Sequence, residues 1–143
     1  MPEVRVVTLA DLTKKPLMDG MGHVEGQYWE VFTKATVGTE ALRLLVQEYP
    51  PGGFTEGHPV HMDFEQTYYV VAGTMTVLIE DQTYQAPAGT FVFIPRGTRH
   101  EHRNDGTEPM LFLTINVPVR EGPVPPLPGP AQPGPAQPGP RAE

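Results

Sequence analysis

The sequence predicts an all-β domain, an antiparallel sandwich or jelly-roll barrel of roughly eight to ten strands. Short runs of alternating apolar and polar residues dominate, and no long stretch has the 3.6-residue period of a helix. Turn residues separate these runs at intervals of about 8 to 12 residues, which is typical of such folds. The expected strands are residues 4–9, 28–33, 41–49, 66–71, 74–80, 83–85, 90–94, 99–104 and 110–117.

Local signals justify these strands in order. Residues 4–9 alternate Val with polar residues and could form an edge strand available for pairing, whereas the Gly- and Met-containing segment 18–26 is expected to be irregular. Residues 41–49 place three aliphatic side chains on one face. Each later strand starts after a turn signal. In chain order these signals are Pro50-Pro51-Gly52-Gly53, Ala72-Gly73, Asp81-Gln82, Pro87-Ala88-Gly89, Pro95-Arg96-Gly97 and Asp105-Gly106.

A change in composition divides the chain in two. Residues 118–143 hold ten of the eighteen prolines and a repeated PGPAQ unit, so we expect a disordered, Pro/Gly-rich tail. Residues 1–117 then form the barrel domain, a normal size for a small fold of this class. No apolar run has the length of a membrane span, and the N-terminus lacks the layout of a signal peptide.

Charge and cysteine content narrow the function classes. The net charge of −7, without a basic stripe, argues against a nucleic-acid partner and favours a small-molecule substrate. The absence of cysteine excludes disulfides and thiolate metal sites. We therefore expect a cytoplasmic protein that does not act at a membrane.

The segment GTFVFIPRGTRHEHRN, residues 89–104, combines turn residues with histidines at fixed spacing. Its spaced positions are Gly89, Pro95, Gly97, His100 and Asn104. The two glycines permit turns with positive φ, and the proline fixes the end of a strand. Because strand side chains alternate, His102 and Asn104 face the barrel interior if His100 does.

A second segment, PGGFTEGHPVHMDFEQTYYVVAG, precedes it. Together the two segments resemble the two sequence motifs of the cupin superfamily, and the resemblance spans about residues 40–118. It implies a cupin jelly roll, one bound metal ion and pairing of two copies through their sheets. The 89–104 segment matches its motif at every position, whereas the earlier segment departs from its motif at two ligand positions.

At each of the two ligand positions that differ from the motif, a residue of the expected type lies one position away. In the cupin pattern His61 occupies the second histidine position, Pro59 the first, and Gln66 the position of the glutamate. His58 and Glu65 are the neighbouring substitutes. A regular strand would point His58 and His61 to opposite faces, so both can be ligands only with a bulge or a turn between them, and Pro59 favours a bulge. The register of the strand predicts Gln66 inward and Glu65 outward.

The candidate metal site is drawn from four histidines and one amide. Histidine is the commonest metal ligand near neutral pH. The expected ligands are His61 and His100, completed from His58, His102 and Gln66. Such a set is neutral, so the ion keeps its full charge and is a strong Lewis acid. Zinc is favoured, and iron, nickel or manganese would also suit the ligands.

Among cupins, the chain is similar to the small single-domain enzymes of aromatic polyketide pathways. That similarity implies ring closure of a poly-β-ketone by aldol chemistry, in antibiotic biosynthesis, with His102 and Gln66 as the candidate catalytic residues. The expected substrate is polyketide-like, apolar or aromatic, and the protein a homodimer. The alternatives are a metal-dependent dioxygenase acting on an aromatic or diketone substrate, and a non-enzymatic small-molecule binder.

Two further polar residues have no role assigned by the motifs. We expect His23 at the surface or the pocket rim. Arg43 is expected in solvent, and the alternative is an inward-facing side chain that binds an anion or a carbonyl group. The pocket is expected to be lined by aromatic side chains drawn from Trp29, Phe32, Phe54, Phe64, Tyr69, Phe91, Phe93 and Phe112.

Overall fold

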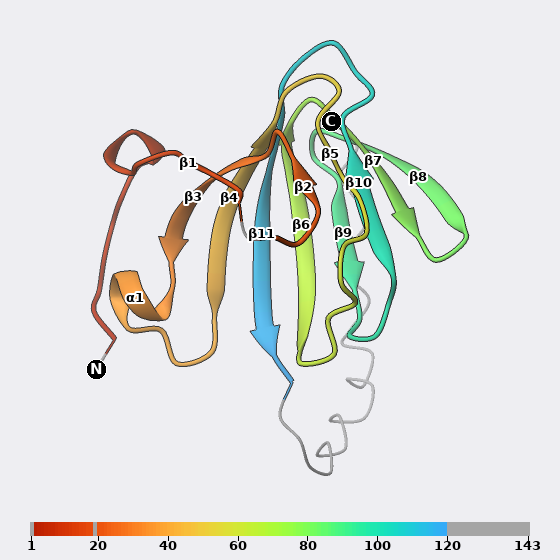
Figure 1. Ribbon diagram of the computed structural model, residues 1–143. Helices are drawn as coiled ribbons and strands as arrows, with labels where there is room; N and C mark the ends of the chain where they lie inside the picture. Colours follow the sequence, from red (N-terminus) through yellow and green to blue (C-terminus); the bar gives the residue numbers. More distant parts are fainter. Residues whose placement is uncertain (1, 19, 120–143) are drawn as a thin grey trace, which may run out of the picture.

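The computed structural model describes residues 2–18 and 20–119, which form two antiparallel sheets (Figure 1). The first sheet has the order β1 (Lys15–Pro16), β3 (Gln27–Phe32), β4 (Arg43–Tyr49), β11 (Met110–Pro118), β6 (Phe64–Ala72) and β9 (Phe91–Ile94). The second has the order β2 (His23–Val24), β5 (Phe54–Thr55), β10 (His100–Arg103), β7 (Thr74–Ile79) and β8 (Gln82–Pro87). This architecture confirms the predicted all-β jelly roll.

The N-terminal strand prediction is wrong. Residues 4–8 form no strand and are followed by the 3-10 turn η1 (Leu9–Asp11). Val4 and Val6 are fully exposed, and Thr8 bonds the Asp11 carboxylate through its backbone N–H and its hydroxyl group. The valines Val4 and Val6 therefore bury no face, and one edge of the first sheet is the short strand β1 instead.

One short helix, α1 (Lys34–Val37), interrupts the strands and was not predicted. The Thr33 hydroxyl oxygen accepts the backbone N–H of Thr36, and Gly38 closes the helix at a φ of 72°. A single turn is too short to show a helical period, so pattern alone does not reveal it.

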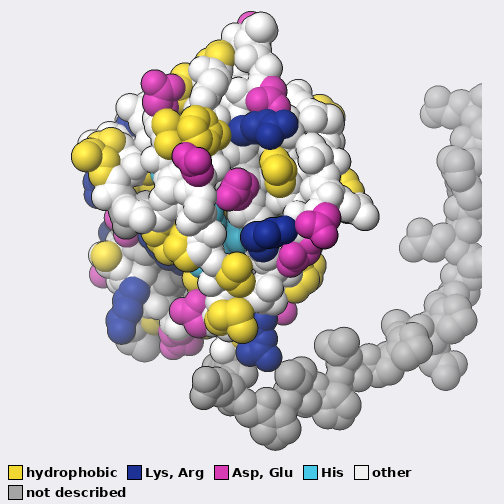
Figure 2. All heavy atoms as spheres, turned by 45° about the vertical axis from the view of Figure 1, so that its right-hand side comes forward, with side chains coloured by type: hydrophobic (Ala, Val, Ile, Leu, Met, Phe, Trp, Pro, Cys, Tyr) yellow, Lys and Arg dark blue, Asp and Glu magenta, His cyan; other side chains and the backbone are white. Residues whose placement is uncertain are grey.

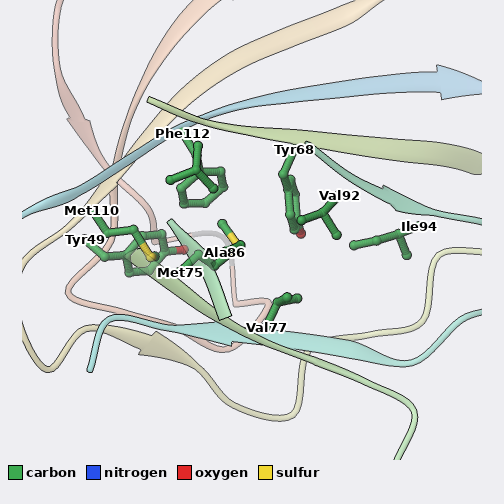
Figure 3. Close-up of a cluster of buried hydrophobic side chains, with 10 residues drawn as sticks. Tyr49, Tyr68, Met75, Val77, Ala86, Val92, Ile94, Met110 and Phe112 are labelled. Atoms are coloured by element: carbon green, nitrogen blue, oxygen red, sulfur yellow. The ribbon is translucent and has the colours of Figure 1, made fainter. Parts of the chain in front are cut away.

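The inward face of β11 changes character along the strand. Met110 and Phe112 are fully buried in the apolar core, while Thr114 and Asn116 are buried polar residues further along the same face. Figure 3 shows the core side chains, which are Tyr49, Tyr68, Val70, Met75, Val77, Ala86, Val92, Ile94, Met110 and Phe112. One end of the barrel is thus packed with apolar side chains, and the other end is polar.

The strand β11 runs slightly beyond the predicted domain boundary. It includes Pro118, and the Val119 backbone N–H donates to the Asp63 carbonyl at 2.9 Å. The rest of the predicted tail lies outside the described residues. None of the helices in the described part of the chain has the length and hydrophobicity that a membrane crossing needs.

Candidate metal centre

His100 is placed by the turn that precedes β10. Gly89 and Gly97 have φ values of 91° and 78°, as their motif positions require. His100 is 3% exposed, and its Nδ1–H donates to the Thr98 carbonyl at 2.9 Å. This tautomer leaves a lone pair on Nε2, which has no hydrogen-bond partner among the described residues. A buried nitrogen of this kind is suited to binding an ion.

His58 and His61 lie on the loop between β5 and β6. The chain leaves the strand conformation between the two histidines instead of forming a bulge, and Pro59 stands in irregular backbone. His58 Nδ1–H donates to the Met21 carbonyl at 2.8 Å, so its Nε2 also carries a lone pair. That Nε2 lies 2.9 Å from His61 Nε2. In a strand, two residues three positions apart would face opposite sides. The loop has no such alternation, so both histidines can point to the same place.

Two backbone contacts hold this loop. The Gly97 N–H donates to the His61 carbonyl at 2.7 Å and links the two motif segments. On the other side, the Glu56 N–H donates to the Gly22 carbonyl at 2.8 Å. A Cβ at Gly22 would lie 1.8 Å from the Glu56 carbonyl oxygen, so only glycine permits this approach. Met21 precedes Gly22, so the close contact of Gly22 with Glu56 also places the Met21 carbonyl beside His58.

The three histidines form a group that fits a metal ion. One ring nitrogen from each of His58, His61 and His100 lies within 4.8 Å of the other two. Nitrogen ligands about 2.1 Å from one ion are separated by about 3.0 to 3.4 Å when they are neighbours. His58 and His100 each donate Nδ1–H to a carbonyl oxygen. Histidines that bind metals usually make such a contact, which fixes the tautomer and the orientation of the ring.

Burial favours the neutral form of two members of the group, His61 and His100. Burial lowers the pKa of His61 to about 4, and the neighbouring His58 and His100 contribute to this lowering. Burial also lowers the pKa of His100 from its usual value, against the effect of its bond to Thr98. Neutral imidazoles are the form that binds metal, so His61 and His100 need not release a proton at neutral pH.

His102 and Gln66 lie outside this group of three. His102 is 3% exposed and lines the pocket beside the group, and neither ring nitrogen has a hydrogen-bond partner among the described residues. Burial holds its pKa well below the usual value. Gln66 faces inward and Glu65 outward, as predicted. The Gln66 amide accepts from Tyr68 and donates to Asn116, each at 2.9 Å. Their roles as ligands stay predictions.

His23 also belongs to the site, although the sequence suggested no role for it. It lies on β2, and its ring centroid is 5.2 Å from that of His58 and 6.3 Å from that of His102. Its Nδ1 makes a short hydrogen bond with the Tyr49 hydroxyl. All five histidines of the chain therefore meet around one site, a convergence that their total number could have suggested.

Four of the five histidines, His23, His58, His61 and His102, border an open cavity of about 300 Å³. None of its described lining residues is Asp or Glu, although the chain contains seventeen such residues. Of the aromatic side chains expected to line it, only Phe64 does so; Phe112 is in the core, and Phe91 and Phe93 are exposed. Figure 2 shows one face of the molecule, on which a small area of histidine lies between charged side chains. A separate surface depression is lined by residues that include His102, Glu101 and Arg103.

The family described as "Cupin domain" matches residues 45–116, half of the chain. The chain belongs to the cupin family. The matched residues include both motif segments and four of the histidines. Cupins commonly bind a metal. No curated protein matches the sequence significantly.

Solved cupin structures resemble the chain in fold. A predicted oxalate decarboxylase from Thermotoga maritima superposes with a TM-score of 0.72 at 20% identity, over 80% of this chain and 100% of that one. The polyketide cyclase RemF from Streptomyces resistomycificus gives 0.71 at 24% identity, over 81% and 80%. A sugar phosphate isomerase from Silicibacter pomeroyi gives 0.68 at 14% identity, over 79% and 75%. These neighbours are mostly enzymes, with different reactions.

Proposed function

We propose that this cupin is a metal-dependent cyclase that closes a ring in a poly-β-ketone chain by aldol-type condensation. The observation that carries the proposal is the group of His58, His61 and His100 beside a cavity whose described lining has no carboxylate. A neutral ligand set leaves a divalent ion, zinc by preference, its full charge. Similarity of fold to a polyketide cyclase supports the proposal.

The reaction needs no oxidant. One methylene carbon between two carbonyls loses a proton and attacks a second ketone carbon, and the resulting hydroxyl group leaves as water. A divalent ion held by the three histidines would supply Lewis acidity, which makes a ketone more electrophilic and its neighbouring methylene more acidic. The pocket supplies the folded conformation of the chain, from which much of the rate would come.

His102 is the candidate base of this reaction. It lines the cavity, lies outside the group of three, and is neutral because burial lowers its pKa. A neutral imidazole with an unpartnered nitrogen can accept the methylene proton and return it to the departing hydroxyl group. Gln66, fixed at both ends of its amide by Tyr68 and Asn116, would position the substrate carbonyl.

Ring closure and metal content test the proposal together. Nonane-2,4,8-trione has a methylene carbon between two carbonyls, and attack of this carbon on the third ketone gives 2-acetyl-3-methylcyclohex-2-enone with loss of one water, which ultraviolet absorbance follows. We expect turnover by the zinc-loaded protein, and loss of both zinc and turnover in His61→Ala. Full turnover by metal-free His61→Ala would remove the mechanism.

The second candidate is a metal-dependent dioxygenase, since the same histidine group suits iron. Incubation of the iron-loaded and zinc-loaded proteins with acetylacetone distinguishes the two reactions. Oxygen consumption by the iron form alone favours the dioxygenase. Tight binding of a ligand that is recovered unchanged favours a non-enzymatic binder.

The protein is further expected to be a cytoplasmic homodimer. The predicted edge strand 4–9 is absent, so another surface must pair. The strand β9 ends the first sheet and exposes Phe91 and Phe93 to 73% and 58%. Large exposed aromatic side chains at a sheet edge favour pairing with another copy.

A further inference from the structure

Arg43 lies at the cavity with no partner in the described part of the chain. It starts β4, is exposed and lines the cavity together with His23, His58, His61 and His102. On another side it borders a depression that includes Glu30 and Glu40. No ion pair forms with either, and Glu30 instead contacts Lys15 at 3.7 Å and Thr33 at 2.9 Å. The guanidinium group is therefore available to a ligand.

The sheet places Arg43 in one row with two amides. Asn116 of β11 pairs with Arg43 on one side and with Gln66 on the other. All three line the cavity. Adjacent strands are about 4.8 Å apart, so Arg43 and Gln66 are separated by about 10 Å across the sheet. The row therefore runs along the cavity wall from the Gln66 amide through Asn116 to the Arg43 guanidinium group.

A chain of side-chain hydrogen bonds runs from Tyr68 through Gln66 to Asn116, and in each bond the earlier residue is the donor. The Tyr68 hydroxyl group donates to Gln66 Oε1 at 2.9 Å. Gln66 Nε2 then donates to Asn116 Oδ1. Asn116 Nδ2 is left as a donor without a partner among the described residues, next to Arg43. In the next row, Thr114 accepts from Gln47 and retains its hydroxyl hydrogen for a ligand.

The polar groups on this side of the cavity that lack a partner for their hydrogens are hydrogen-bond donors. A set of donors with a positive charge favours an anionic ligand. Arg43 contributes a permanent positive charge, Asn116 and Thr114 contribute neutral donors, and no described lining residue contributes a negative charge. We propose that Arg43 and Asn116 form a carboxylate subsite, so the substrate is a keto acid whose carboxylate binds here while its ketones lie at the histidines. The inference rests on the proposed function and specifies its substrate class.

Succinylacetone, a β-diketone with a terminal carboxylate, is a suitable probe, and its methyl ester is the neutral match. Calorimetric titration of the zinc-loaded protein should give a dissociation constant at least about tenfold lower for the acid, because charge-assisted hydrogen bonds are the strong ones. In Arg43→Gln the acid and ester should bind about equally, with the ester unaffected. Arg43→Lys keeps the charge without the forked geometry and should be intermediate.

Arg5→Gln is the matched control, because it removes the same charge from an exposed arginine whose ion pair within the described residues is with Glu3. It should leave the ratio of acid to ester affinity unchanged. A wild-type protein without preference for the acid, or a preference that survives in Arg43→Gln, overturns the subsite. Repeating the titration after chelation of the zinc separates the two proposals. The cyclase proposal fails if the zinc-loaded protein closes no ring, or if ring closure persists without the histidines or the metal, whereas failure of the subsite appears only in the affinity ratio.

Discussion

His58 and His61 face each other through their Nε2 atoms at 2.9 Å, although they lie three positions apart on the same loop. His58 cannot supply a proton to this contact, because its Nδ1 bears the hydrogen that Met21 accepts. The two nitrogens are already about as close as neighbouring ligands of one ion. His100 brings the third nitrogen from the opposite motif segment.

Replacing any of these three histidines by alanine should weaken zinc binding at least about tenfold, since each removes one of three ligand atoms. Metal content after dialysis and a competitive chelator titration measure the effect. His23→Gln is the matched control, because His23 borders the same cavity but lies outside the group. Zinc affinity that is unchanged in His61→Ala would contradict the assignment.

The metal-free protein should lose stability as the pH falls from about 6.5 to about 4. The pKa of His61 is about 4 in the folded protein against an ordinary value of 6.5, so between these limits the unfolded chain binds more protons. Both states are neutral above this window, where the stability is fully present. Urea unfolding at several pH values measures the slope.

His61→Gln is the comparison for this slope, because glutamine does not titrate. The variant should retain more of its stability between pH 6.5 and 4 than the wild-type protein does. Equal slopes in the two proteins would assign the pH dependence to other groups.

Tyr68→Phe should lower the free energy of unfolding by about 1 to 2 kcal/mol, because it leaves the buried Gln66 carbonyl oxygen without its donor. The chain offers a matched control in Tyr84, whose hydroxyl group makes the same contact with Gln82 two residues earlier, but on an exposed strand. Tyr84→Phe should stay within about 0.5 kcal/mol. Equal losses in urea unfolding would mean that burial does not decide the value of this bond.

The double substitution of Phe91 and Phe93 by serine should shift the protein from dimer to monomer in sedimentation experiments. Both side chains are exposed on β9, and burying them against a second copy would stabilise the pair. Tyr84→Ser is the control, since Tyr84 is exposed on the edge strand of the other sheet. A dimer that survives the double substitution places the interface elsewhere.

The sequence predicted most of the fold because its turns carry their own chemistry. Gly89 and Gly97 adopt the positive φ that the motif implied, and eight of the nine expected strands have a counterpart in the structure. The strand predicted at residues 4–9 is absent from the structure. Alternation of apolar and polar residues shows only that one face could be buried, not that a partner strand is present. The short strands β2 and β5 are too brief to leave a pattern.

The site was predicted only in part, for a different reason. Strand alternation correctly placed His100, His102 and Gln66 inside the barrel. It could not place His58 and His61, which a loop orients, or His23, which reaches the site through the contact of Gly22 with Glu56. Arg43 was expected in solvent, and it is exposed, yet its register opposite Asn116 puts it on the cavity wall. Such neighbourhoods follow from pairing between distant segments.

The two-part character of β11 bears on how such a barrel can change its specificity. Met110 and Phe112 maintain the fold, while Thr114 and Asn116, one and two pleats further along, contact whatever enters the cavity. Substitutions at the second pair can alter ligand preference at little risk to folding, because the apolar residues are left intact. A laboratory library restricted to these positions and Arg43 should yield mostly folded variants with new ligand preferences.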